Sequence, residues 1–235
     1  MTGAACSRIS VFMPKMPQPG AKPLITPLAA QGLRPVFVDR WSDKIRIRTL
    51  RPADVTTEIA AWLTDPAVME GLNAPQKAMG LDAFRTYVAS FDNLKRNLMT
   101  ILGLPHGQPL GLAVMEVDLR HRLGSLHLIV GDPENRGKNV AFEASAVLLR
   151  HFFRERKLEK VTFQPLARNK AAIAVCERSG LRLEGTLRAH RIDGRTGERL
   201  DQMLYALTLE EYDERIRSLE AAGMVRPFSG PGLPA

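Results

Sequence analysis

The chain has 235 residues, of which 45% are hydrophobic and 25% are charged, and its formal net charge is +8. This composition is typical of a globular protein, and the length suffices for one domain with terminal extensions. No apolar run approaches the ~18 residues of a membrane-spanning helix, so a transmembrane segment and a membrane partner are excluded. The positive charge favours anionic ligands such as coenzymes, nucleotide-sugars or RNA-associated proteins, without choosing among them.

The N-terminal stretch is rich in proline and contains no acidic residue before Asp39. It is basic, because it contains Arg8, Lys15, Lys22 and Arg34. We predict that residues 1–42 form a poorly ordered arm, which is either a solvated extension or a segment that binds an acidic partner.

Strand and helix patterns alternate after this arm. Ile45 and Ile47 alternate with arginines, which predicts a half-exposed strand. Apolar residues at helical spacing then predict three helices, at residues 55–63, 65–72 and 81–94. Apolar runs at 98–104 and 110–117 flank a turn that contains Pro and Gly, and they predict a β-hairpin.

The second half of the chain continues this alternation. Residues 126–130 are the next predicted strand, and the apolar stripe over residues 140–152 predicts the clearest helix of the chain. A strand at 161–164 follows this helix, so the two strands are expected to be parallel. The remaining predicted elements are a helix over 169–180, a hairpin of strands 181–192 and 203–207, and a helix over 209–222. We expect one α/β domain over residues 43–222 and a flexible tail over 223–235.

The loop from Gly131 to Asn139 joins a predicted strand to the clearest predicted helix. Free N–H groups of such a loop, together with the N-terminus of a helix, form an anion-binding site. Arg136 and Lys138 add positive charge at this point. The sequence therefore predicts a site for a diphosphate.

The two cysteines, Cys6 and Cys176, match no metal-binding or disulfide pattern, so we expect no metal site. The longest apolar patch near the N-terminus covers residues 9–13, which is too short for the core of a signal peptide. These features favour a protein of the reducing cytoplasm.

Three segments resemble the GNAT superfamily of acetyl-CoA-dependent N-acyltransferases, and the resemblance covers about residues 43–215. They are residues 45–54 (IRIRTLRPAD), 131–144 (GDPENRGKNVAFEA) and 169–185 (NKAAIAVCERSGLRLEG), with Asp193 and Asp201 after the third. The chain looks most like the ribosomal-protein alanine N-acetyltransferase branch. This resemblance implies a mixed, mostly antiparallel sheet with a splayed parallel strand pair and flanking helices, and acetyl-CoA as co-substrate.

The family's pyrophosphate motif, Arg-x-x-Gly-x-Gly/Ala, is similar to residues 136–141. The resemblance assigns to the coenzyme Arg136, Gly137, Lys138, Asn139, Val140 and Ala141, the main chain of Leu128, Ile129 and Val130, and Asn169. Asn139 replaces the family's middle Gly. Asn is the residue besides Gly that best occupies a left-handed conformation, so the loop can keep its shape, but a side chain at this point could crowd the diphosphate.

Acetyl transfer to an amine needs a base for the ammonium and an acid for the departing thiolate. Cys176 lies where many family members have a tyrosine that protonates the thiolate, so its thiol is the candidate acid, although such a cysteine is often only a buried residue. His127 is the candidate base, and Glu116 is the second choice. Relatives often carry a glutamate at the position of Ser125.

The sequence thus predicts an enzyme that moves an acetyl group from acetyl-CoA to a primary amine by direct transfer in a ternary complex. The acceptor is a protein N-terminus or a small amine, and an amino-sugar nucleotide, a polyamine and an aminoglycoside stay open. An acidic cleft would favour polyamines or aminoglycosides, and a basic cleft would favour nucleotide-sugars or ribosome-bound targets.

The alternative is a non-catalytic module on the GNAT scaffold that binds RNA or protein. Otherwise nucleic acid is not expected as a partner, except through a ribosome-associated target. A homodimer is compatible with the resemblance.

Overall fold

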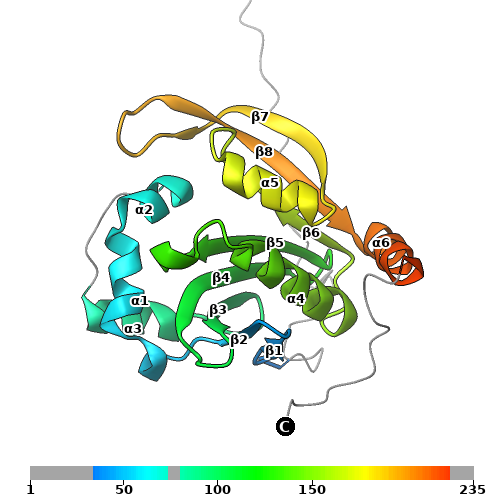
Figure 1. Cartoon of the computed structure of the whole chain (residues 1–235). Coiled ribbons are helices and arrows are strands. Elements are labelled where there is room, and N and C mark those ends of the chain that lie inside the picture. Colours follow the sequence, from blue (N-terminus) through cyan, green and yellow to red (C-terminus); the bar gives the residue numbers. More distant parts are fainter. Residues whose placement is uncertain (1–33, 74–79, 223–235) are drawn as a thin grey trace, which may run out of the picture. The chain divides into compact units, whose positions relative to one another are not determined.

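One mixed sheet organises the part of the chain that the computed structural model describes, residues 34–73 and 80–222 (Figure 1). Its strand order is β1-β2-β3-β4-β5-β6-β8-β7. Neighbouring strands are antiparallel, except that β5 and β6 are parallel. The strands are β1 (Asp39–Trp41), β2 (Ile45–Thr49), β3 (Arg96–Gly103), β4 (Pro109–Asp118), β5 (Leu123–Val130), β6 (Lys160–Phe163), β7 (Arg182–Ile192) and β8 (Arg199–Thr208). The predicted mixed, mostly antiparallel fold with one parallel pair is confirmed.

Helices cover both faces of this sheet (Figure 1). They are α1 (Thr57–Ala61), α2 (Pro66–Leu72), α3 (Leu81–Ala89), α4 (Val140–Arg154), α5 (Lys170–Arg178) and α6 (Leu209–Ala221), with 3-10 turns at Pro52–Asp54, Trp62–Thr64 and Pro133–Asn135. One core cluster joins the sheet to α4 and α6, and a second joins it to α1 and α3. None of these described helices is long and apolar enough to cross a membrane.

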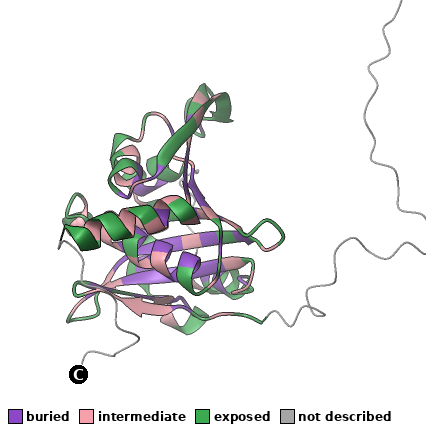
Figure 2. Cartoon of the chain, turned by 90° about the vertical axis from the view of Figure 1, so that its right-hand side faces the viewer, coloured by how far each residue is buried: buried purple, intermediate pink, exposed green. Residues whose placement is uncertain are grey.

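The two core clusters follow from the alternation of side chains along β3 and β4. Successive side chains of a strand point to opposite faces of the sheet. Met99 and Met115 therefore belong to the cluster under α4, whereas Leu98 and Leu112 belong to the cluster under α1 and α3. Figure 2 shows the buried residues concentrated on the central strands. The sheet is thus fixed from both sides, and its middle strands position the site.

Local sequence signals explain where the main helices begin and end. In α4, the apolar residues Ala144, Leu148 and Phe152 recur at helical spacing, and all three are fully buried. At α2, the Asp65 side chain accepts hydrogen bonds from the first amides of the helix. This helix ends at Asn73, whose left-handed conformation (φ 51°, ψ 43°) is one that asparagine tolerates.

The predicted boundary of the N-terminal arm is wrong at its end, because β1 lies inside residues 1–42 and pairs with β2. A three-residue strand is too short to show a period of two, and it is held by its partner, including an ion pair of 2.6 Å between Asp39 and Arg46. Residues 1–33 and the predicted tail over 223–235 lie outside the described residues. β8 also begins at Arg199, earlier than predicted, because charged residues interrupt its apolar pattern.

Candidate active site

The parallel strands β5 and β6 pair only at their first residues. Their register ends at Ser125 and Thr162. From Leu126 to Val130, β5 remains paired with β4 on one side, and no described strand pairs with its other edge. An extended ligand can use such a free edge as if it were an added strand. The splayed pair expected from the family resemblance is therefore present.

A cavity of about 410 Å³ is lined by residues of β5, β6, α2, α4, α5, β7 and β8 and of their connecting loops. Five residues that the sequence predicted for the site line this cavity: His127, Leu128, Ala141, Asn169 and Cys176. Three further lining residues, Asn73, Arg191 and Gln202, were not predicted. The described part of the lining contains no Asp or Glu side chain and includes Arg191, so its charge is neutral to basic. The described residues also include no cluster of His, Cys, Asp and Glu that could hold a metal ion.

The loop before α4 has the shape of an anion-binding site. Gly137 (φ 76°) and Asn139 (φ 65°, ψ 8°) are both in the left-handed region, as expected for Asn in place of Gly. The Asn139 side chain does not cap the helix but accepts a hydrogen bond of 2.8 Å from Arg178 on α5. The first amides of a helix have no partner within it, so the amides at the start of α4 are left for a ligand.

Arg136 uses its side chain to hold the protein together. Its guanidinium donates to the Asp65 carboxylate at 2.8 Å and to the carbonyl oxygens of Gly131 (2.9 Å) and Val130 (3.2 Å). The pKa of Asp65 is lowered, above all by this hydrogen bond from Arg136. Arg136 therefore links the end of β5 to the start of α2. Its main-chain amide also donates to the Pro133 carbonyl at 3.3 Å, so both its side chain and its amide have partners within the protein.

His127 lines the cavity from β5, where part of the residue is exposed to solvent and the rest is enclosed by protein. The pKa of His127 is lowered, mainly because the surrounding protein removes water from the imidazole, and the charge of Arg191 lowers it further. Glu116 opposes this shift from the neighbouring strand, where it pairs in register with Ser125. Glu116 does not line the cavity and lies 3.9 Å from Arg96. Of the two candidate bases, His127 is therefore the one that lines the cavity and has a lowered pKa.

Cys176 lies on α5 with only 1% of its surface exposed. Burial raises the pKa of its thiol to about 12, so the thiol is protonated at neutral pH. Asn169, at the start of the same helix, caps it by accepting a hydrogen bond of 3.0 Å from the Ala172 amide.

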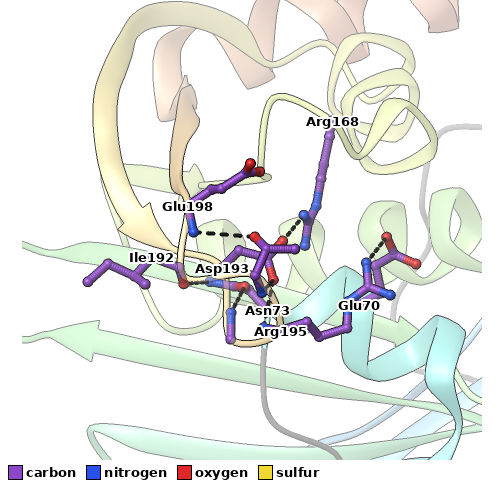
Figure 3. A network of polar contacts seen from close by, with 9 residues as sticks. Glu70, Asn73, Arg168, Ile192, Asp193, Arg195 and Glu198 are labelled. Carbon is purple, nitrogen blue, oxygen red and sulfur yellow. Dashed lines mark hydrogen bonds and ion pairs between the residues drawn. The ribbon is translucent and has the colours of Figure 1, made fainter.

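A network of polar contacts, which includes the lining residue Asn73, ties α2 to the β7–β8 turn (Figure 3). The Asn73 side chain donates to the Ile192 carbonyl at 2.8 Å and accepts from the Gly194 amide at 3.3 Å. Asp193 is 3% exposed and pairs with Arg168. The Arg195 amide and the Arg168 side chain lower the pKa of Asp193 to about 2, so the carboxylate is charged at neutral pH.

Comparisons with known proteins agree with this geometry. The family model of the acetyltransferase (GNAT) domain matches residues 44–182, and the chain belongs to this family. No curated protein matches the chain. The chain is an acetyl-CoA-dependent N-acetyltransferase, and the free edge of β5 and the open amides of α4 suit the coenzyme.

Solved structures of similar fold come from several kinds of acetyltransferase. A GNAT-family acetyltransferase from Bacillus anthracis has 20% identity and a TM-score of 0.64, with 74% of this chain and 99% of that chain covered. A spermidine N-acetyltransferase from Vibrio cholerae, solved with CoA and spermine, has 19% identity and a TM-score of 0.65, with coverages of 73% and 99%. A ribosomal-protein alanine acetyltransferase from Vibrio fischeri has 14% identity and a TM-score of 0.64, with coverages of 74% and 97%.

Proposed function

We propose that the protein transfers the acetyl group directly to a primary amine while both substrates are bound along the cavity beside β5. The observation that carries this proposal is that His127 on β5, and Asn169 and Cys176 at the start and in the body of α5, line one cavity where β5 and β6 diverge. The cavity extends from the free edge of β5 to α2 and the β7–β8 hairpin. In this proposal, the thioester and the acceptor bind in it together.

The coenzyme would be held mainly by main-chain groups. The pantetheine arm would bond to the free edge of β5 at residues 128–130, and the diphosphate would accept hydrogen bonds from amides among residues 137–141, apart from that of Lys138, which donates to the Asn135 carbonyl at 3.3 Å. Lys138 is exposed beside these amides and adds a positive charge. Asn169 uses its side-chain oxygen as a cap, which leaves its side-chain amide hydrogens for the coenzyme arm.

The transfer needs two proton movements. In this proposal, His127 takes the proton from the acceptor ammonium, directly or through a water molecule, and the free amine then attacks the thioester carbonyl. The carbon–sulfur bond breaks and the nitrogen releases its second proton. The Cys176 thiol donates a hydrogen bond to the departing thiolate, or donates its proton and recovers one from the nitrogen. Burial keeps the Cys176 thiol protonated, and the Glu177 carboxylate raises its pKa further, so a covalent acetyl-cysteine is not part of the proposal.

The acceptor is a protein N-terminus or a small amine. The solved relatives leave both open, since one is titled a spermidine and another a ribosomal-protein alanine acetyltransferase. The absence of carboxylates from the described cavity lining argues against a polycation, which acidic side chains would bind better. A cytoplasmic location and a homodimer stay predictions.

The proposal is tested by measuring free thiol released from acetyl-CoA with a panel of primary amines. The wild-type chain should release thiol only when an acceptor is present, and His127→Gln should lower kcat by about 10²- to 10⁴-fold. His106→Gln, an exposed histidine in the β3–β4 turn, is the matched control and should keep the wild-type rate. Failure with every amine, together with salt-sensitive retention of RNA, would favour the non-catalytic module.

A further inference from the structure

The β7–β8 hairpin is irregular at the point where it borders the cavity. Its register joins Leu187 to Gln202 and then Arg191 to Leu200, so residues 188–190 face a single residue of β8. Ala189 has φ 51° inside this bulge, and its amide donates to the Asp201 carboxylate at 2.7 Å. A left-handed alanine costs about 1–2 kcal/mol, and bulges of this kind redirect side chains next to active sites.

Arg191 is the side chain that follows this bulge, and it lines the cavity. Its Nε donates at 3.0 Å to the side-chain oxygen of Gln202, which is 7% exposed. The other end of the Gln202 amide donates at 2.7 Å to the Gln164 carbonyl. The buried glutamine therefore orients the guanidinium and occupies only its Nε, while the two terminal nitrogens make no hydrogen bond or ion pair within residues 34–73 and 80–222.

The segment that carries Arg191 is also fixed on its other side. The next two residues, Ile192 and Asp193, are bound by Asn73 and Arg168 in the network of Figure 3. Arg191 is thus held on one side by its hydrogen bond to Gln202 and on the other by the β7–β8 turn, which Asn73 and Arg168 bind. A charged side chain that is fixed before a ligand arrives loses little freedom when it binds one.

The charge of Arg191 affects which acceptor amines the cavity binds. It is near enough to His127 to lower the pKa of that imidazole, and Glu116, which lies on β4 outside the cavity, acts on the imidazole in the opposite direction. Within the described lining of the cavity, Arg191 is a cation and no carboxylate faces it. An acceptor that carries an anionic group close to its amine would be attracted by the guanidinium of Arg191. The planar guanidinium suits a carboxylate or a phosphate through two parallel hydrogen bonds.

We infer that Arg191, presented by the bulge and oriented by Gln202, is the acceptor-recognition residue and selects amines that bear a carboxylate or a phosphate. This inference rests on the proposed function, because it names the substrate class of the same site. It excludes polyamines as the preferred acceptors. The phosphates of the coenzyme do not explain Arg191, since the α4 amides are available for them.

Matched acceptor pairs test the inference. Ornithine and putrescine differ by one carboxylate, and glucosamine 6-phosphate and glucosamine differ by one phosphate. In at least one pair, the wild-type kcat/KM for the anionic member should be about 10-fold or more above that of its twin. Arg191→Ala should remove this preference mainly through KM, and Arg191→Lys, which keeps the charge but loses the Nε donor, should be intermediate. The pair that responds identifies the anionic group.

Arg188→Ala is the matched control, because Arg188 is exposed on the same hairpin and does not line the cavity. It should keep the wild-type preference. Four outcomes would overturn the inference but not the proposed function. They are equal rates within both pairs, a preference for putrescine over ornithine, an unchanged preference in Arg191→Ala, and binding of CoA without turnover of any of the four acceptors. Absence of CoA binding by calorimetry would instead overturn the proposed function, and the inference would fall with it.

Discussion

Asn139 is the residue at which this chain departs most clearly from the coenzyme-binding motif of its family. The structure keeps the left-handed backbone at this position and turns the Asn139 side chain to Arg178. The guanidinium of Arg178 also lies 4.6 Å from the centre of the Phe142 ring, which fixes this arrangement over the first turn of α4. The substitution therefore preserves the loop and keeps the amide side chain bonded to α5.

A pair of substitutions at Asn139 separates backbone shape from side-chain bulk. Asn139→Gly keeps the left-handed conformation and should leave the Kd for CoA within about threefold of wild type, because glycine occupies this region freely. Asn139→Val, whose branched side chain resists the conformation, should weaken CoA binding by about tenfold or more, since the strain is ~1–2 kcal/mol. Calorimetric titration of both variants decides the point, and equal affinities would show that the conformation is not needed.

The lowered pKa of His127 predicts the pH dependence of the reaction. The neutral imidazole is the active form, so kcat/KM should fall as the pH decreases through this pKa. The midpoint should lie below the ordinary histidine value of about 6.5. Arg191→Ala should move the midpoint upwards, because the charge of Arg191 lowers the pKa of His127. A midpoint above 6.5 in the wild type, measured with acceptors whose own ionisation is known, would argue against His127 as the base.

At the scale of elements, the contact between the 3-10 turn at Trp62–Thr64 and the end of β5 fixes the loop that leads to α4. A β-carbon on Gly131 would overlap the ring of Trp62, which is 5% exposed in the second core cluster. Gly131→Ala should therefore lower the free energy of unfolding by about 1–3 kcal/mol. Gly185→Ala is the control, because a β-carbon there meets nothing within 4 Å. Equal urea midpoints for the two variants would refute this packing argument.

His151 makes the stability of α4 depend on pH. Its side chain is 1% exposed, and burial lowers its pKa to about 4, although Glu155 lies 3.0 Å from its Nδ1 and opposes the shift. The unfolded chain takes up this proton near pH 6.5 and the folded chain only near pH 4, so stability falls as the pH decreases between these values. The loss attributable to His151 is about 3 kcal/mol below pH 4.

Urea unfolding at pH 7 and at pH 4 measures this effect. His151→Phe, which keeps an aromatic ring in contact with Phe152, should show a smaller loss between the two pH values than the wild-type chain does. The difference between the two losses of unfolding free energy gives the contribution of His151 alone, because the carboxylates that titrate in the same pH range contribute to both. Parallel pH dependences for wild type and variant would show that His151 does not titrate as proposed.

At the scale of the whole molecule, the sequence was sufficient for the order of elements but not for every strand. The 3.6-residue period of α4 and the hairpin of β3 and β4 were predicted because their apolar residues are regular. β1 was missed, since three residues carry no period and their strand depends on β2. The start of β8 was missed, because its charged residues face solvent.

Some residues of the candidate site could likewise be predicted from the sequence, and others could not. The left-handed Asn139 could be predicted, because it depends on local backbone preference and a short motif. Arg191 and Gln202 could not, because a bulge shifts Arg191 by two residues against β8 and hides it among the exposed arginines of β7. The Arg136 side chain was predicted to face a phosphate, but its contact with Asp65, which is distant in sequence, depends on the tertiary fold.

The central claim is that the free edge of β5 and the open amides before α4 bind a CoA thioester. Calorimetric titration of the full chain with CoA measures this most directly. Binding at this site should give heat with one site per chain and a melting temperature that rises with CoA concentration. No heat at millimolar CoA and an unchanged melting temperature would contradict it.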